Sequence, residues 1–145
     1  MTTTADHNVR ETLAAAALYF AVVFGTGFVL GPIRVLVVTP HFGERAAVLL
    51  ESPIMLVAIV LAARWIVRRF RRLTPPSALA VGAFALACML AAEFAVMTFF
   101  WRMSLPQYLG MRDPVGLAAY GTLLVVFAAM PWLALRQRGV VAARS

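Results

Sequence analysis

The chain has 145 residues, of which 63% are hydrophobic and 13% are charged, and its mean hydropathy is +0.88. Soluble domains are about 45–50% apolar and about 25% charged, so a water-soluble fold of this length is excluded and lipid has to be the solvent. The net charge of +7 comes from arginine alone, and most of these arginines lie beside apolar segments. Anionic lipid headgroups are therefore the expected partner, and nucleic acid is not. The single cysteine, Cys88, excludes an internal disulfide and a CxxC redox pair.

Residues 1–10 are polar and their charges nearly cancel, which predicts a mobile cytoplasmic tail. Residues 12–30 then carry no charge, and at about 1.5 Å per residue they reach roughly 28 Å, close to the hydrocarbon thickness of a bilayer. We therefore expect the first membrane-spanning helix here. Small side chains let another helix approach closely in a membrane, and three glycines thin the outer half of this helix: Gly25, Gly27 and Gly31.

The residues after this helix are expected to leave the membrane core. A break or kink is predicted at Pro32, because proline lacks a backbone donor and clashes with the preceding turn. Residues 33–38 are apolar but too few to cross, so we expect them at the outer interface, with a re-entrant segment as the alternative. The proline and glycine of residues 39–43 predict a turn, after which the next helix begins at Glu44.

The second helix poses a length problem. Residues 53–63 form an apolar run of only 11 residues, which reaches about 17 Å and is too short to span a bilayer. The helix has to extend over residues 46–67, and this places Glu51 inside the membrane. Pro53 follows it closely and predicts a kink that frees a backbone carbonyl near Leu49.

Residues 64–72 contain five arginines. Loops rich in Arg stay in the cytoplasm during insertion, so this segment and the basic C-terminal residues predict that both termini are cytoplasmic. The arginines expected to set this topology and to meet anionic lipid headgroups are Arg64, Arg68, Arg69, Arg71, Arg72, Arg136 and Arg138.

The third helix is expected over residues 78–101, with Ser77 as its N-cap. Alanines recur at every fourth position and form a smooth face for a close neighbour, the alanine ladder of Ala83, Ala87, Ala91 and Ala95. At about 100° per residue, Glu93 points away from the centre of this ladder, onto a face shared with Met89 and Met97. We therefore expect this helix to meet protein on two sides.

Residues 102–112 are expected to form a second outer loop. Asp113 followed by Pro114 is a strong helix start, and the fourth helix is expected over residues 115–135. The sequence therefore predicts an all-α integral membrane protein, with four transmembrane helices in an up-down bundle and both termini cytoplasmic. The expected location is a bacterial inner membrane, with one transmembrane domain at residues 12–135 between two tails, 1–11 and 136–145.

Ionisable side chains at membrane depth are costly, so each one needs a partner. Counting along the helices places Glu51 and Glu93 at a similar depth in the outer half of the bundle. Arg34 and Arg102 lie near the outer interface and are the natural counter-ions, with His41 above them. Two interpretations stay open: a polar pocket for a proton, a cation or a polar headgroup, and a structural ion pair that fixes the order of the helices.

No catalytic, cofactor or metal site is expected. His7 and His41 both lie outside the spans, which excludes a bis-histidine haem within the bundle, and no spacing of His, Cys, Asp and Glu resembles a zinc or di-iron site. The serines lack an intramembrane base, and the glycines of residues 25–27 lie in a span rather than in a phosphate-binding loop.

Three short motifs lie within residues 31–72: Gly-Pro-Ile-Arg, Gly-Glu-Arg-Ala and Glu-Ser-Pro-Ile-Met. Through them this part of the chain resembles a group of small four-pass inner-membrane proteins of GC-rich bacteria that have no assigned activity. The resemblance implies location and architecture but no function. The small multidrug-resistance transporters are similar in size and number of spans, but they rely on a glutamate within the first helix, where this chain has only Glu11 at the edge.

Three functions remain for comparison. The first is a non-enzymatic membrane protein that acts as a homo-oligomer or as an accessory subunit of a larger complex, favoured by the small-residue faces. The second is a small proton- or cation-coupled transporter with its site at Glu51 and Glu93. It predicts that one carboxylate is left over after Arg34 has paired with the other. The third, a lipid-modifying membrane enzyme, has only the polar outer pocket in its favour.

Overall fold

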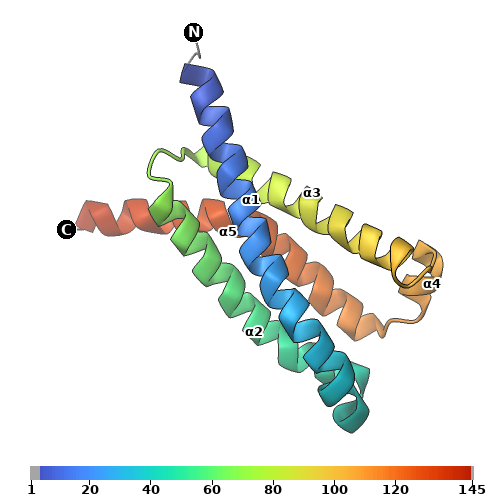
Figure 1. The fold of residues 1–145 in the computed structure, drawn as a ribbon. Helices are drawn as coiled ribbons and strands as arrows, with labels where there is room; N and C mark the ends of the chain where they lie inside the picture. The colour runs from blue at the N-terminus through green and yellow to red at the C-terminus, as the bar shows by residue number, and fades with distance from the viewer. Residues whose placement is uncertain (1–3, 145) are drawn as a thin grey trace.

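The computed structural model describes residues 4–144, and every regular element in that range is a helix. Four long helices run alongside one another and a short helix closes one end (Figure 1). The elements in chain order are α1 (Thr4–Ile33), the π-helix η1 (Arg34–Val38), α2 (Thr39–Arg69), α3 (Pro75–Phe99), α4 (Leu105–Gly110) and α5 (Pro114–Arg144). The expected all-α architecture is confirmed.

The first two long helices form a hairpin whose turn lies at Gly43. Its backbone angles, φ 81° and ψ 164°, belong to a region that glycine alone adopts readily. The expectation of a turn over residues 39–43 is therefore right about the reversal and wrong about its extent, because residues 39–42 remain helical. The new arm begins at Glu44, as predicted, and returns alongside α1 (Figure 1).

The helix continues through Pro32 instead of breaking there. Proline cannot donate to the carbonyl four residues earlier, yet the chain stays helical and passes into the π-helix η1, after which the Thr39 N–H donates to the carbonyl of Arg34 five residues back. The predictions of a break and of a separate segment at residues 33–38 are therefore wrong, because these residues continue the helix of α1. Their expected place at the outer interface stays a prediction.

The polar ends of the chain are helical as far as they are described. Residues 4–10 belong to α1, where Thr12 Oγ1 donates to the Asn8 carbonyl at 2.8 Å and His7 lies 3.6 Å from Glu11. These contacts one turn apart stabilise the first turns, so residues 4–10 are helical, which was not expected from the sequence. The mobility of this tail stays a prediction, and residues 1–3 lie outside the described range. At the other end α5 continues through the basic tail to Arg144.

The loop between α2 and α3 ends in a capping box. The N-cap is Thr74, whose side chain accepts from the Ser77 N–H, while the Ser77 hydroxyl accepts from the Thr74 N–H. The prediction of Ser77 as N-cap is therefore wrong by three residues, because Pro75 and Pro76 supply no N–H and fit the first helical turn.

The backbones of α3 and α5 make their closest approach at Gly82. A Cβ added to Gly82 would lie 1.8 Å from the carbonyl oxygen of Ala128, a distance that no side chain tolerates. The contact is one that membrane helices typically make through small residues. It lies on the face of α3 that carries Ala78, Val81 and Ala85, all fully buried.

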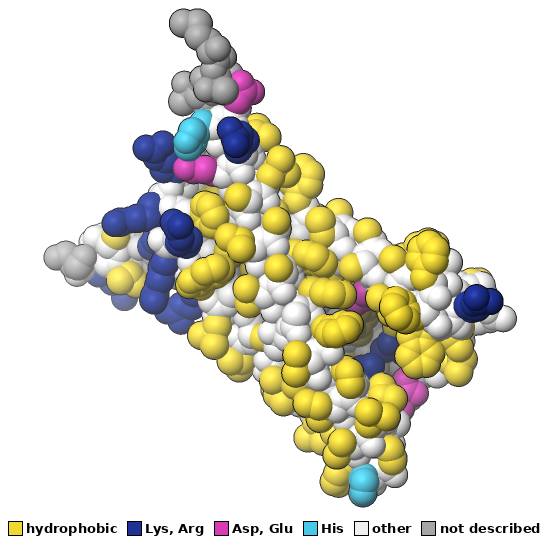
Figure 2. Space-filling view, in the orientation of Figure 1, with side chains coloured by type: hydrophobic (Ala, Val, Ile, Leu, Met, Phe, Trp, Pro, Cys, Tyr) yellow, Lys and Arg dark blue, Asp and Glu magenta, His cyan; other side chains and the backbone are white. Residues whose placement is uncertain are grey.

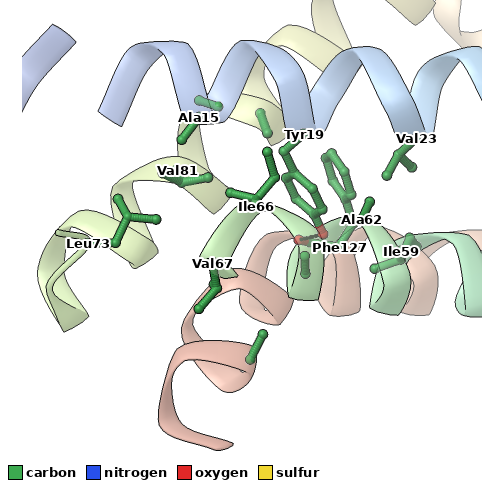
Figure 3. Close-up of a cluster of buried hydrophobic side chains, with 14 of the residues drawn as sticks. Ala15, Tyr19, Val23, Ile59, Ala62, Ile66, Val67, Leu73, Val81 and Phe127 are labelled. Atoms are coloured by element: carbon green, nitrogen blue, oxygen red, sulfur yellow. Dashed lines mark hydrogen bonds between the residues drawn. The ribbon is translucent and has the colours of Figure 1, made fainter. Parts of the chain in front are cut away.

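The hydrophobic core is centred on Tyr19 of α1, which is fully buried. Its ring stacks on that of Phe127 in α5 with 4.6 Å between the centroids, and its hydroxyl donates to the Phe127 carbonyl at 2.8 Å (Figure 3). Ile66 of α2 and Val81 of α3 complete the contact, so all four long helices meet here.

The outer surface of the molecule is apolar. Three helical segments are long and apolar enough to cross a membrane, Asp6–Arg69, Pro75–Phe99 and Pro114–Arg144, and less than a third of the most apolar stretch of each is buried. The first of these has 64 residues and folds back on itself at Gly43. Exposed leucine, valine and phenylalanine side chains cover this face of the molecule (Figure 2), as expected of a multi-pass protein surrounded by lipid.

Candidate functional site

Two adjacent cavities lie toward the end of the bundle that holds the Gly43 turn and α4. The larger, about 670 Å³, lies between α1, η1, α3 and α4. The smaller, about 180 Å³, lies deeper and reaches α2 and α5. Six lining residues belong to both cavities: Gly27, Gly31, Arg34, Glu93, Tyr108 and Arg112.

Arg34 and Glu51 form an ion pair in the wall of the smaller cavity. The Nη1 atom of Arg34 lies 3.1 Å from Oε2 of Glu51, and both side chains are largely buried, with 24% and 16% exposed. η1 positions the guanidinium, and the turn of α2 that precedes Pro53 positions the carboxylate. The structure thus brings together two of the five residues of the predicted site, and it selects Glu51 as the partner of Arg34, a choice that the sequence left open.

Glu93 is the third residue of the predicted site that lines the cavities, and it makes no ion pair within 4.0 Å among residues 4–144. It lies on the face of α3 that holds Met89 and Met97, both buried as predicted. Near it is the buried hydroxyl of Tyr120, which interacts with the Glu93 carboxylate, although no hydrogen bond of standard geometry joins the two groups. A buried polar atom without such a bond is rare, so the Glu93–Tyr120 contact is the least satisfied polar contact of the two cavities.

Sequence reasoning missed Arg112 and Tyr108, which also line both cavities. The Arg112 guanidinium donates to the Tyr108 hydroxyl and lies over its ring, 4.6 Å from the centroid. Both residues lie in the segment that was expected to be a plain outer loop. The short helix α4, capped by Ser104 and Gln107, directs Tyr108 back over the bundle.

Arg102 and His41 do not line either cavity. Arg102 is exposed and has a positive φ of 47°, in the turn that follows α3. His41 is also exposed, and its Nδ1 lies 2.7 Å from the carbonyl of Val37. Their predicted contributions to the site are therefore wrong: His41 lies on the helical residues that precede Gly43, Arg102 lies in the turn after α3, and both side chains are exposed. Arg112 lines the cavities instead.

A second ion pair ties the Gly43 turn to the start of α5. Arg45 donates to both carboxylate oxygens of Asp113, through Nε and Nη2, at 3.1 Å each. Asp113 also accepts from the N–H groups of Val115 and Gly116, which confirms it as the N-cap of α5. The hydrogen bond from Arg45 is the main cause that lowers the pKa of Asp113 below its usual value.

Basic side chains gather at the opposite end of the molecule, where the N-terminal turns, the loop between α2 and α3, and the end of α5 lie (Figure 2). Arg64, Arg68, Arg69, Arg71 and Arg72 are all exposed, as their predicted role requires. Arg138 differs: it donates to the carbonyls of Val67 at 2.7 Å and Arg71 at 3.2 Å, and so caps the end of α2. Arg136 lies over the ring of Trp132 at 4.2 Å.

The two faces of small residues, the glycines of α1 and the alanine ladder of α3, are not used for close helix packing within the chain. In the alanine ladder Ala83, Ala87 and Ala91 are exposed, and the helix contacts of α3 lie on the face of Gly82 and Met89 instead. A Cβ at Gly25 or Gly31 would meet no atom within 4 Å, and one at Gly27 would meet only the side chain of Met55. The prediction of a close helix neighbour is therefore wrong for these glycines within the chain, and for the alanine ladder it stays a prediction about a partner.

Comparison with protein-family models, with curated proteins and with solved structures found no match. The resemblance of residues 31–72 to small four-pass inner-membrane proteins therefore stays a prediction. Among residues 4–144 no three side chains of His, Cys, Asp or Glu come together as metal ligands would. The chemistry available at the cavities is that of carboxylates, guanidinium groups and tyrosine hydroxyls.

Proposed function

We propose that the chain crosses a bacterial inner membrane four times, with both termini in the cytoplasm. The fold-back at Gly43 supports two crossings within the first 64-residue apolar segment. The exposed arginines at one end of the bundle support the orientation, because loops rich in Arg stay in the cytoplasm. This topology puts both cavities in the outer half of the membrane.

A reporter that is active only in the periplasm tests this topology. Fused after residue 72, in the loop between α2 and α3, it is expected to be inactive, whereas a reporter inserted after Gly43 is expected to be active. The opposite pattern would contradict the orientation, and activity at both positions would contradict the four crossings.

We propose further that the protein is a small proton- or cation-coupled carrier, with Glu93 as the exchanging group. The observation that carries the proposal is the leftover carboxylate: Arg34 is already paired with Glu51, while Glu93 makes no ion pair among residues 4–144 and has the hydroxyl of Tyr120 as its neighbour. Ionisable groups within a membrane bundle are costly to keep, and they often line proton or ion pathways.

The test is flux into proteoliposomes that contain the purified protein. The wild-type chain is expected to carry protons or a monovalent cation, and Glu93→Gln is expected to abolish the flux while leaving the fold intact. Glu11→Gln is the matched control, because Glu11 lies far from the cavities near the N-terminal end of α1. Equal flux through the wild type and Glu93→Gln would exclude Glu93 as the exchanging group.

The second candidate is a homo-oligomer or an accessory subunit of a larger complex. The exposed alanine ladder of α3 favours it, because a smooth helix face is suited to close packing in lipid. Cross-linking in native membranes through cysteine placed at Ala87 tests it. A dimer or a captured partner supports an interface there, and a monomer throughout would rule it out. Cys88, the only native cysteine, is exposed one position away and is replaced by serine in this experiment.

A further inference from the structure

The larger cavity opens between α1 and α3, toward the surroundings of the bundle. The two helices cross and then diverge toward the end that holds α4 (Figure 1). The rim carries large apolar side chains that are more than half exposed, among them Phe28, Leu36, Trp101 and Met111. Figure 2 shows a hollow here in which basic and acidic side chains are framed by apolar ones.

The floor of this cavity holds two opposite charges that are not paired with each other. Arg112 and Glu93 both line it, yet no nitrogen and oxygen of theirs lie within 4.0 Å. The other guanidinium, of Arg34, is already bound to Glu51. At the rim Glu44 adds a second carboxylate, which is exposed. A ligand that carries a negative and a positive group a few bonds apart would satisfy both partners.

We propose that this cavity binds the headgroup of a zwitterionic phospholipid that reaches it sideways from the outer leaflet. The phosphate meets Arg112 and the Tyr108 hydroxyl, since guanidinium groups and phosphates form strong charge-assisted hydrogen bonds. The ammonium group meets Glu93, and an acyl chain lies along the apolar rim between Phe28 and Trp101. The location in the outer leaflet rests on the proposed topology. The volume of about 670 Å³ falls in the usual range of small-molecule sites.

The charges distinguish this headgroup from the alternatives. An anionic phospholipid offers a phosphate to Arg112 but leaves Glu93 facing a neutral glycerol. A cationic amphiphile satisfies Glu93 and leaves Arg112 without an anion. Only a zwitterionic headgroup pairs both Arg112 and Glu93. In a low-dielectric pocket, leaving either charge unpaired would weaken binding.

Photo-cross-linking in nanodiscs tests the proposal. The probes are phosphatidylethanolamine and phosphatidylglycerol that carry the same photoactivatable acyl chain, and the readout is the labelled fraction of the peptides that contain Phe28 and Trp101. Phosphatidylethanolamine is expected to label these peptides about tenfold more, the ratio that one lost hydrogen bond to a charged group produces. Equal labelling by the two lipids would overturn the proposal.

Two glycines of α1 provide a matched steric pair. A Cβ added at Gly31 or at Gly25 meets nothing within 4 Å, so either position accepts leucine, but only Gly31 lines the cavities. Gly31→Leu is expected to remove the labelling by phosphatidylethanolamine, while Gly25→Leu labels as the wild type does. The same labelling in both variants would place the lipid elsewhere and overturn the proposal.

Two variants that remove a charge from the cavity, and a soluble headgroup added as competitor, extend the labelling experiment. Arg112→Gln is expected to reduce labelling by both lipids, whereas Glu93→Gln removes the preference for phosphatidylethanolamine. Excess glycerophosphoethanolamine is expected to compete weakly, since it lacks the chain, and full competition would identify the ligand as a free phosphoamine instead of a lipid. Preferential labelling by phosphatidylethanolamine without ion flux would refute the carrier and support the lipid site. Ion flux without this preference would support the carrier and overturn the lipid site.

Discussion

The hydroxyl of Tyr19 donates to the carbonyl of Phe127 at 2.8 Å, and this is the carbonyl that Pro131 leaves without its helical partner. In an uninterrupted helix the N–H of residue 131 would bond to that oxygen, but proline has none. In a low-dielectric interior a carbonyl without a donor is costly. Tyr19, on a helix more than a hundred residues earlier, supplies the donor and stacks on the Phe127 ring at the same time.

Tyr19→Phe is therefore expected to lower the free energy of unfolding by about 1–3 kcal/mol, because it leaves the buried carbonyl without a donor while keeping the ring. In a Pro131→Ala background, residue 131 can donate its own N–H to the Phe127 carbonyl. Tyr19→Phe should therefore lower the free energy of unfolding much less there. Unfolding in mixed detergent micelles, followed by helical circular dichroism, measures this double-mutant cycle. Equal costs in the two backgrounds would show that the Tyr19 hydroxyl does not substitute for the N–H that Pro131 lacks.

Gly82→Ala is expected to destabilise the protein by about 3 kcal/mol or more, because the new methyl group would overlap the Ala128 carbonyl and force α3 away from α5. Gly121→Ala is the control on α5, since a Cβ there meets nothing within 4 Å, and a helical Gly→Ala change at an open site is mildly stabilising. Melting temperatures in one detergent compare the two variants. Similar melting temperatures for both would contradict the close approach at Gly82.

Asp113→Asn tests the ion pair between the Gly43 turn and α5. Because Arg45 lowers the pKa of Asp113, its contribution to stability is complete above the usual pKa near 3.8 and is lost as the pH falls through the lower value of the folded state. The variant should therefore melt slightly below the wild type at pH 7, and the difference should vanish in acid. The effect is small because the pair is exposed, and asparagine retains the N-cap. A constant difference down to the lowest pH would point to another cause.

Arg138→Gln is expected to destabilise the protein by about 1 kcal/mol, since it removes the donors to two carbonyls at the end of α2. Arg136→Gln removes the same charge from the same end of the molecule but only a contact with a tryptophan ring, so it should cost less. Hydrogen exchange of the amides at the end of α2 gives the local readout. Faster exchange in both variants alike would mean that charge alone stabilises this end.

Composition and periodicity were enough to predict an all-helical fold, and depth alone placed Arg34 near Glu51 and Glu93, without indicating which carboxylate it would bind. Both depend on local quantities: the length of an apolar run and the rise per residue. The structural effect of a proline was predicted less well. Pro32 was expected to break or kink the helix, but the helix continues through it and passes into the π-helix η1. A residue type indicates that a bond is lost without indicating how the chain compensates.

The rest of the site could not be predicted because it depends on tertiary geometry. Arg112 and Tyr108 reach the cavities only because α4 turns back over the bundle, and a segment of six helical residues leaves little periodicity to detect. Tyr120 did carry a signal. It lies four residues after Gly116 and seven before Phe127, on the buried face of α5, so a polar group at that spacing in an apolar helix could have been identified.

The ion pair of Arg34 and Glu51 has a consequence for how the protein is made. In the four-crossing arrangement Arg34 has to travel through the hydrocarbon ahead of the Gly43 turn, while its carboxylate partner is still emerging from the ribosome. A lone guanidinium resists that passage, whereas a neutralised one does not. The first two arms should therefore partition into the bilayer together, as a preassembled unit, and a nascent chain truncated before Glu51 should stall with its leading arm still on the cytoplasmic side.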